Sequence, residues 1–245
     1  MVMLKKVARK VRARIRELIG TAPVLRPSAH NERLIRLGTT YGGWTLADRP
    51  ELHGSTIISA GLGEDGTFDI GFSERYRARV IIVDPTPRAI EYYAAKIPNN
   101  GCFELCPRAL WNKATHLKFF APNNPAHVSH SLINFVNNYA TDTPGIEVET
   151  TTMAALVARH GLPEIVKLDI EGAEIEVVCN MLSNGIRPRQ ILVEYDEMLA
   201  PSVKSRKRIE IAHRALLASG YSLIHYDYPA NFLYVQASSL ASKSA

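Results

Sequence analysis

Two stretches of the chain carry residue types that bind nucleotide-like ligands. The first is the loop 61–66, Gly-Leu-Gly-Glu-Asp-Gly, which follows an apolar run. Glycines let a backbone turn sharply and approach a ligand closely, and the next helix offers free amide groups at its start. The second is Asp84, which ends another apolar run, 18 residues after Gly66. A carboxylate there can accept hydrogen bonds from both hydroxyls of a ribose, so the two stretches predict a site for an adenosine-type nucleotide.

The loop also matches GxGxxG, the pattern of NAD-binding turns, so an NAD-dependent oxidoreductase is the main alternative. Glu64 and Asp65 stand where the phosphates of a dinucleotide would lie, and two carboxylates would repel them. S-adenosylmethionine is a sulfonium cation without phosphates and tolerates acidic neighbours. We also find no phosphate-binding cation near residues 61–66. The sequence therefore favours S-adenosylmethionine as the cofactor, and a plain glycine turn is the remaining alternative.

Alternating strand and helix patterns position these residues. Apolar runs predict strands over 56–60, 80–84, 103–105, 165–169 and 191–194, and periodicity predicts helices over 66–76, 87–97, 152–160, 173–182 and 203–219. Such alternation is typical of a parallel sheet with helices on both faces. The last two strands, 221–226 and 232–236, are joined too closely for a crossover helix and should pair antiparallel. The predicted fold class is α/β, with a mostly parallel sheet and an antiparallel C-terminal strand pair.

From about residue 40 to 235 the chain resembles the FkbM-type family of S-adenosylmethionine-dependent methyltransferases. The stretches that carry the resemblance are Tyr41-Gly-Gly-Trp44, Ile58-Ser-Ala-Gly-Leu-Gly-Glu-Asp65 with Phe68-Asp69, Asp84-Pro-Thr-Pro87, Ala109-Leu-Trp111, His127-Val-Ser-His-Ser131 and Lys167-Leu-Asp-Ile-Glu-Gly-Ala-Glu174. The last motif is the most specific. The resemblance implies the Rossmann-like class I methyltransferase fold and methyl transfer, commonly to a hydroxyl oxygen of a sugar, glycolipid or natural product.

The resemblance also implies where the cofactor binds. Gly61 and Gly63 would pass beneath its methionine part, Asp84 would hold the ribose, and Ala109 and Leu110 would flank the adenine. These positions all follow predicted strands. We therefore expect them to lie together at the carboxyl edge of the sheet.

Two positions depart from the general class I pattern. Ser59, which we include among the cofactor-binding residues, stands where many class I enzymes have an acid. Asp65 stands where many have a third glycine. Both fit this family's Gly-Glu-Asp-x-x-Phe-Asp variant of the loop.

Methyl transfer to oxygen is an in-line displacement, so it needs alignment of the reacting atoms and a base for the hydroxyl proton. The predicted catalytic residues are Asp169, Glu171 and His130, and His127 is a further candidate base. Asp169 and Glu171 have an alternative role as acids that stabilise a helix N-terminus. We assign Glu174 to that structural role.

The predicted substrate-binding residues are His127, Ser129, Tyr41 and Trp44. His127 and His130, which lie in a polar loop, have the alternative of being simply solvated. Tyr41 and Trp44 have the alternative of anchoring the N-terminal layer, which we favour slightly. The acceptor itself is not specified by the sequence.

We predict no metal site. Asp169 and Glu194 are hard oxygen ligands that suit a divalent cation, but the sequence supplies no third ligand. Cys102 and Cys106 lack partners at zinc spacing. Three cysteines are also too few for a disulfide scaffold and are typical of reduced thiols, which predicts a cytoplasmic location.

The net charge of +5 is concentrated in one segment. Residues 1–20 contain seven Lys or Arg and one Glu and carry +6, whereas the other 225 residues carry 22 basic and 23 acidic groups, or −1. Nucleic-acid binders present a broad basic face, and a body of −1 does not. We therefore expect no nucleic-acid partner, and RNA methylation stays open only as an analogy of fold.

The basic segment has the pattern of an amphipathic helix. Its apolar residues fall on one arc of a helical wheel: Leu4, Val7, Ala8, Val11, Ile15 and Leu18. This stripe can pack on the protein body, or it can lie on an anionic membrane as a peripheral contact. A mitochondrial transit peptide is a third interpretation. A non-catalytic module that binds a membrane or partner through residues 1–20 is the corresponding alternative function.

We expect four segments along the chain: a basic amphipathic helix over 1–22, a cover segment over 23–55, the methyltransferase domain over 56–237 and a flexible tail over 238–245. No apolar run reaches the ~20 residues that a membrane-spanning helix needs. The sequence does not specify an oligomeric state.

Overall fold

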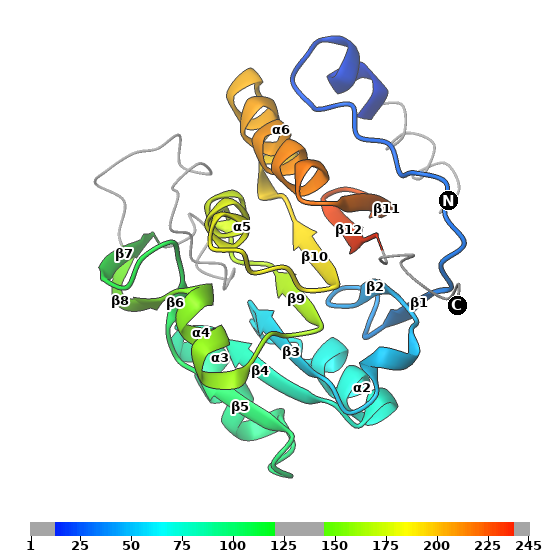
Figure 1. The fold of residues 1–245 in the computed structure, drawn as a ribbon. Helices are drawn as coiled ribbons and strands as arrows, with labels where there is room; N and C mark the ends of the chain where they lie inside the picture. The colour runs from blue at the N-terminus through cyan, green and yellow to red at the C-terminus, as the bar shows by residue number, and fades with distance from the viewer. Residues whose placement is uncertain (1–12, 121–144, 238–245) are drawn as a thin grey trace.

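A seven-stranded sheet forms the centre of the computed structural model, which describes residues 13–120 and 145–237 (Figure 1). Its strand order is β11-β12-β10-β9-β3-β4-β5. The strands are β3 (Thr56–Ala60), β4 (Arg79–Val83), β5 (Phe103–Cys106), β9 (Ile165–Leu168), β10 (Gln190–Glu194), β11 (Tyr221–Asp227) and β12 (Asn231–Gln236). Strands β3, β4, β5, β9 and β10 pair in parallel, and β12 pairs antiparallel with both β10 and β11. The predicted fold class is confirmed.

The order of the strands reverses next to β3. From β3 the chain continues outward to β4 and β5, and it then returns to the other side of β3 to form β9 and β10. Ligands of such sheets bind outside the carboxyl ends of the strands at this switch point. The residues that follow β3 and β9 therefore define the expected site.

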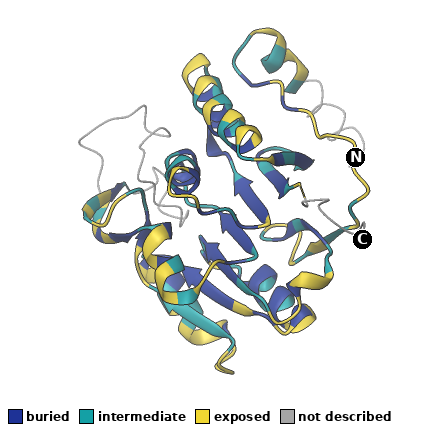
Figure 2. Cartoon of the chain, in the orientation of Figure 1, coloured by how far each residue is buried: buried dark blue, intermediate teal, exposed yellow. Residues whose placement is uncertain are grey.

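Five α-helices cover the two faces of the sheet, as Figure 1 shows. They are α2 (Thr67–Tyr76), α3 (Pro87–Lys96), α4 (Met153–His160), α5 (Glu174–Ser183) and α6 (Val203–Ala218), with short 3₁₀ turns η1 (Pro50–Leu52) and η2 (Asp196–Met198). Buried side chains of α4, α5 and α6 join one core cluster, and those of α2 and α3 join another. The inner strands of the sheet between the two clusters are mostly buried, whereas the edge strand β5 is half-buried (Figure 2).

Side-chain caps set the starts of two of these helices. The Thr152 hydroxyl accepts a hydrogen bond from the Ala155 amide at 3.1 Å and begins α4. The Ser202 hydroxyl accepts one from the Ser205 amide at 3.0 Å and begins α6. Such hydroxyls satisfy amides that have no partner within the helix.

Two smaller sheets were not predicted as such. A hairpin of β1 (Leu34–Leu37) and β2 (Trp44–Ala47) lies beside the central sheet, and the buried Gln190 amide bonds both the nitrogen and the oxygen of Ala47 at 2.9 Å. The second sheet joins β6 (Ala109–Leu110), β7 (His116–Phe120) and β8 (Gly145–Thr151). Residues 121–144, between β7 and β8, lie outside the described residues.

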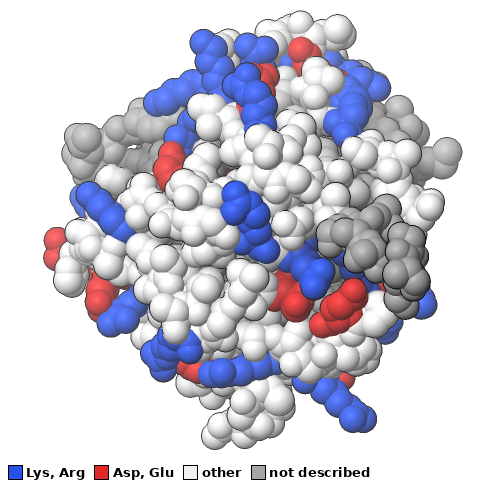
Figure 3. Space-filling model, in the orientation of Figure 1, with Lys and Arg blue, Asp and Glu red and all other residues white. Residues whose placement is uncertain are grey.

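The N-terminal segment is described from residue 13, so Leu4, Val7, Ala8 and Val11 of the predicted stripe lie outside the described residues. Its last helical residues, 13–18, lie beside η2, just before the start of α6, where the Arg16 guanidinium donates to the Met198 carbonyl. Lys and Arg side chains gather along this edge of the molecule, as Figure 3 shows. None of the helices in the described part of the chain is long and apolar enough to cross a bilayer.

Candidate functional site

In the glycine loop after β3, Gly61 and Gly63 lie in different surroundings. Gly61 has φ +87°, and a Cβ there would lie 1.7 Å from the Asp169 carbonyl oxygen, because β3 and β9 are neighbours. Gly63 has φ +55°, and a Cβ there would meet nothing within 4 Å. Gly61 is thus required by packing between strands, whereas Gly63 borders open space. Their predicted contacts with a cofactor stay predictions.

Asp84 fastens this loop to the end of β4. Its Oδ2 accepts hydrogen bonds from the amides of Leu62 and Gly63 at 2.9 and 3.1 Å. Its Oδ1 accepts from the amide and hydroxyl of Thr86 at 2.9 and 2.7 Å. A carboxylate has about four lone-pair sites, so the two hydroxyls of a ribose would have to replace two of these donors. The ribose contact stays a prediction, and the structure adds a second role for Asp84 in shaping the loop.

Asp65 ties the loop to the β1–β2 hairpin. Its Oδ1 accepts hydrogen bonds from the amide and hydroxyl of Thr67 at the start of α2, and its Oδ2 accepts from the Thr39 hydroxyl. A Cβ on Gly42 would lie 2.6 Å from the Asp65 carboxyl carbon. The hydrogen bonds of Asp65 explain an acid in place of a third glycine. The close contact explains Gly42 of the Tyr-Gly-Gly-Trp motif, whereas a Cβ on Gly43 would lie 2.3 Å from the Thr39 carbonyl oxygen.

One expectation about this loop is wrong. The sequence places no phosphate-binding cation near residues 61–66, yet Arg88, in the first turn of α3, donates two hydrogen bonds to Glu64. The fold brings together residues that are far apart in the chain. Because Arg88 already pairs with Glu64, the acids of the loop are what still disfavours binding of the phosphates of a dinucleotide.

Lys167 is the site residue that the sequence reasoning missed. It is buried within β9, its ammonium donates to the Gly61 carbonyl, and it pairs with Asp169 Oδ2 at 3.4 Å. The same ammonium lies 5.4 Å from the centre of the Trp44 ring. Lys167 therefore connects the glycine loop with a predicted catalytic acid. A lysine inside an apolar strand was the signal, because a buried charge needs partners.

Two further buried polar side chains lie near Lys167. Asp69, on α2, is buried, and desolvation raises its pKa while the charge of Lys167 opposes that shift. Ser59, in β3, is also buried beside it. Oxygen atoms of both side chains lack a hydrogen-bond partner in the structure. The predicted cofactor role of Ser59 stays a prediction.

Carboxylates gather where β9 and β10 end. Asp169 follows β9 and Glu194 ends β10, and these two strands are paired. Burial, and then the charges of Asp169 and Glu171, raise the pKa of Glu194 to about 8. Glu171 has φ +56°, a left-handed conformation that is costly for a residue with a side chain. Such unfavourable conformations and shifted acids are typical of functional sites.

Glu174 has the structural role that we assigned to it. Its Oε1 accepts from the Ile170 amide at 2.7 Å and its Oε2 from the Gly172 amide at 2.9 Å. Burial, and then the charge of Glu197, raise its pKa. The carboxylate therefore shapes the loop that carries Asp169 and Glu171.

Tyr41 and Trp44 lie in different surroundings. Tyr41, in the β1–β2 turn, is 87% exposed, yet desolvation and the charges of Asp169, Glu171 and Glu194 raise the pKa of its hydroxyl. The three carboxylates therefore lie near enough to the Tyr41 hydroxyl to act on it through their charge. Trp44 is buried in β2 against Lys167, as an anchoring residue would be. A contact of either residue with the substrate stays a prediction.

The remaining predicted site residues fall into two groups. Ala109 and Leu110 are buried in β6, which pairs with β8, and their contact with adenine stays a prediction. His127, Ser129 and His130 lie outside the described residues. For the alternative of a metal at Asp169 and Glu194, the described residues hold no group of three or more side chains suited to bind an ion.

Comparison with known proteins gives one family match. The model of the methyltransferase FkbM domain matches residues 48–210. No curated protein matches the chain. Among solved structures, Aeropyrum pernix fibrillarin with natively bound S-adenosyl-L-methionine is 13% identical, with 88% of this chain and 85% of that chain covered and a TM-score of 0.41. The precorrin-6y C5,15-methyltransferase of Geobacter metallireducens is 10% identical, with 76% and 82% covered and a TM-score of 0.38.

Proposed function

Because the chain belongs to the FkbM methyltransferase family, and is thus an S-adenosylmethionine-dependent methyltransferase of the class I fold, we propose that it methylates a hydroxyl oxygen. The proposed acceptor is a sugar, a glycolipid or a natural product. The supporting observation is the position of Asp169. It lies at the switch point of the sheet, against Gly61 of the loop and beside Lys167.

The residues present suit this cofactor. Open space borders Gly63, and the loop carries two acids, so a cation without phosphates meets no repulsion there. When bound, S-adenosylmethionine supplies a methyl group on a sulfonium sulfur. We propose that it is held by Ser59, Gly61, Gly63, Asp84, Ala109 and Leu110.

Asp169 is the proposed base. Lys167 holds Oδ2 of its carboxylate, which orients the side chain and leaves Oδ1 to accept the proton of an acceptor hydroxyl. The Asp169 side chain is about one third exposed, so an acceptor can reach it. Glu171, on the same loop, and His130 are the other proposed catalytic residues. His127, Ser129, Tyr41 and Trp44 are the proposed substrate contacts.

Calorimetry tests the cofactor site. We expect the full chain to bind S-adenosylmethionine, and Asp84→Ala to bind it at least about tenfold more weakly, because the loop loses its anchor and the ribose an acceptor. Glu91→Ala, at an exposed position of α3, is the matched control and should bind normally. Failure of the wild-type chain to bind either the cofactor or its demethylated product would contradict the proposal.

Mass spectrometry of a cell extract tests the acceptor. The extract is incubated with the protein and a cofactor labelled in its methyl group, and Asp169→Asn serves as the control that binds the cofactor but transfers little label. We expect the label in an ether on a hydroxylated small molecule, sugar or lipid. Label only in RNA, or only in protein, would show that the acceptor class is wrong.

A further inference from the structure

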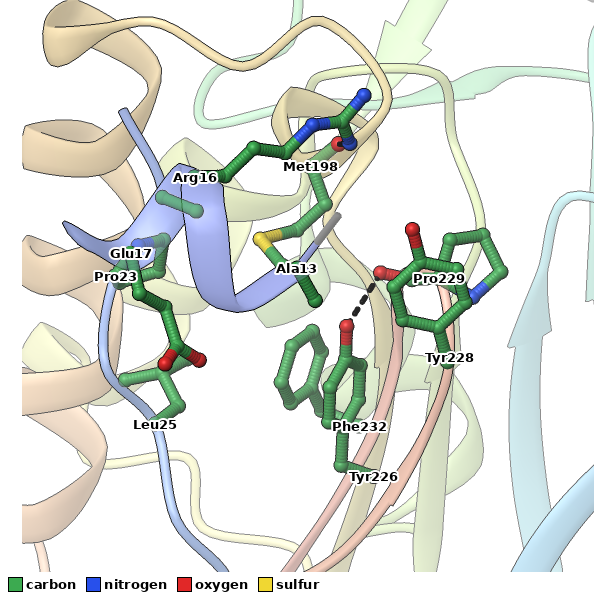
Figure 4. Close-up of a pocket in the computed structure, with 11 residues that line it drawn as sticks. Ala13, Arg16, Glu17, Pro23, Leu25, Met198, Tyr226, Tyr228, Pro229 and Phe232 are labelled. Carbon is green, nitrogen blue, oxygen red and sulfur yellow. Dashed lines mark hydrogen bonds between the residues drawn. The ribbon is translucent and has the colours of Figure 1, made fainter. Parts of the chain in front are cut away.

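The helical residues 13–18 have a defined orientation on the body. Ala13, Arg16 and Glu17 line a small pocket together with Met198 and Tyr226, as Figure 4 shows. The Arg16 guanidinium donates to the Met198 carbonyl at 3.4 Å. One face of this helix is therefore the packing face.

The opposite face is apolar and exposed. At ~100° per residue, Ile15, Leu18 and Ile19 fall on one arc that points away from Ala13, Arg16 and Glu17. Their exposed fractions are 50%, 85% and 65%. The described part of the predicted stripe therefore does not pack on the body, because another face of the helix takes that place.

Contacts after the helix hold it in this orientation. Arg26 donates two hydrogen bonds to Glu17, at 2.8 and 2.6 Å, and Leu25 is buried in the core of α5 and α6. Arg14 also pairs with Glu17, at 3.2 Å. The single acid of residues 1–20 thus lies between two cations, and the segment keeps a net charge of +6.

The surroundings of this apolar arc are basic. Arg14, next to Ile15, is exposed, residues 1–20 carry +6 in sequence, and α6 has exposed Lys204, Lys207 and Arg214. Figure 3 shows Lys and Arg side chains gathered along this edge of the molecule. Apolar side chains among cations match the boundary between the headgroups and acyl chains of an anionic bilayer. A partner protein would need an apolar patch surrounded by acids.

The register of the sheet places this surface near the site. Glu194, the last residue of β10, pairs with Asn231, so the turn before Asn231 lies at the carboxyl edge of the sheet. Tyr228 and Pro229 of that turn line the same pocket as Ala13, Arg16 and Glu17 of the helix. The apolar arc and the candidate site therefore belong to the same edge of the molecule.

We propose that residues 13–26 dock the protein on an anionic membrane surface, with Ile15, Leu18 and Ile19 entering the headgroup boundary. The proposal depends on this surface alone and not on the acceptor proposed above. Cosedimentation with vesicles of phosphatidylcholine and phosphatidylglycerol tests it. We expect binding that decreases as added salt shortens the Debye length, and little binding to phosphatidylcholine alone.

Paired substitutions distinguish binding through this surface from nonspecific adsorption of the protein to vesicles. Leu18→Ser with Ile19→Ser should weaken vesicle binding by about tenfold or more, since two exposed apolar side chains are lost. Leu162→Ser, at an exposed leucine between α4 and β9, is the matched control and should bind like the wild type. Both variants should keep the wild-type melting temperature, because the substituted side chains are exposed.

A fluorescent variant reports insertion directly. The emission of Leu18→Trp should shift to the blue when anionic vesicles are added. Absence of vesicle binding, binding that Leu18→Ser with Ile19→Ser leaves unchanged, or an unshifted emission would each overturn the proposal. So would a dimer of the full chain that the paired substitution dissociates, because a second copy would then be the occupant.

Discussion

A single lysine joins the two halves of the candidate site. Lys167 binds the carbonyl of Gly61 on one side and the carboxylate of Asp169 on the other, and its charge lies beside the buried Asp69. The apolar run 165–168 predicts the strand correctly, but its lysine gains a role only when β3 becomes the neighbour of β9. Contacts between strands that are a hundred residues apart are beyond sequence patterns.

We expect Lys167→Met to lower the free energy of unfolding by about 3 kcal/mol, because the buried Asp69 loses its neighbouring cation. Affinity for S-adenosylmethionine should also fall, since the Gly61 carbonyl loses its donor. Urea denaturation and calorimetry measure the two effects. Lys207→Met, at an exposed position of α6, is the control. Equal behaviour of the two variants would show that Lys167 does not organise the site.

Glu194 should make stability depend on pH. Its pKa is raised from 4.5 to about 8, so between these values the folded chain holds a proton that the unfolded chain has released. The contribution of Glu194 to the free energy of unfolding is therefore fully present at low pH. It is lost as the pH rises toward 8, by up to about 1.4 kcal/mol per pH unit. Glu194→Gln should flatten this slope in urea denaturation between about pH 5 and pH 8. An unchanged slope would place the titration elsewhere.

At the scale of elements, strand and helix positions follow from local patterns, whereas loop contacts do not. The bounds of α4, which its Thr152 cap begins, and those of β3, β4, β9 and β10 agree closely with the predictions, because capping and apolar runs act over a few residues. The β1–β2 hairpin was missed, since its strands have four residues each and its turn is shaped by the distant Asp65.

The two loop glycines give a matched pair of substitutions. Gly61→Ala places a Cβ into the Asp169 carbonyl at φ +87°, so we expect a loss of several kcal/mol or a failure to fold. Gly63→Ala meets open space and should cost only about 1 kcal/mol for its left-handed backbone. If that space holds the cofactor, Gly63→Ala folds and loses affinity for S-adenosylmethionine. Normal affinity in the folded variant would place the cofactor elsewhere.

At the scale of the whole molecule, charge separates a basic N-terminal segment from a body of net charge −1. The segment contacts η2 through Arg16 and Met198 and shares a pocket with the β11–β12 turn, and the candidate site lies around β3 and β9. In the sheet order, β10 lies between the β11–β12 pair and β9. The proposed membrane-docking segment and the candidate site of methyl transfer are therefore different parts of the chain.

Deletion of residues 1–20 should remove vesicle binding and leave affinity for S-adenosylmethionine within about twofold, because none of the proposed cofactor contacts is removed. Calorimetry and cosedimentation of the same preparation measure both. Loss of cofactor affinity together with the melting transition would show instead that the segment is a structural layer. The full-length Leu18→Ser with Ile19→Ser variant then remains the test of docking.

The sequence by itself determined the α/β class, the family, the loop at Gly61, and the candidate acids Asp84 and Asp169, because these depend on local spacing. Only the tertiary structure decided that Asp84 holds the loop and that Lys167 connects the loop with Asp169. It also decided that Arg88 pairs with Glu64, and that Ile15 and Leu18 face away from the body. Those facts depend on which distant elements become neighbours. Strand order and packing set that proximity, and no spacing along the chain encodes it.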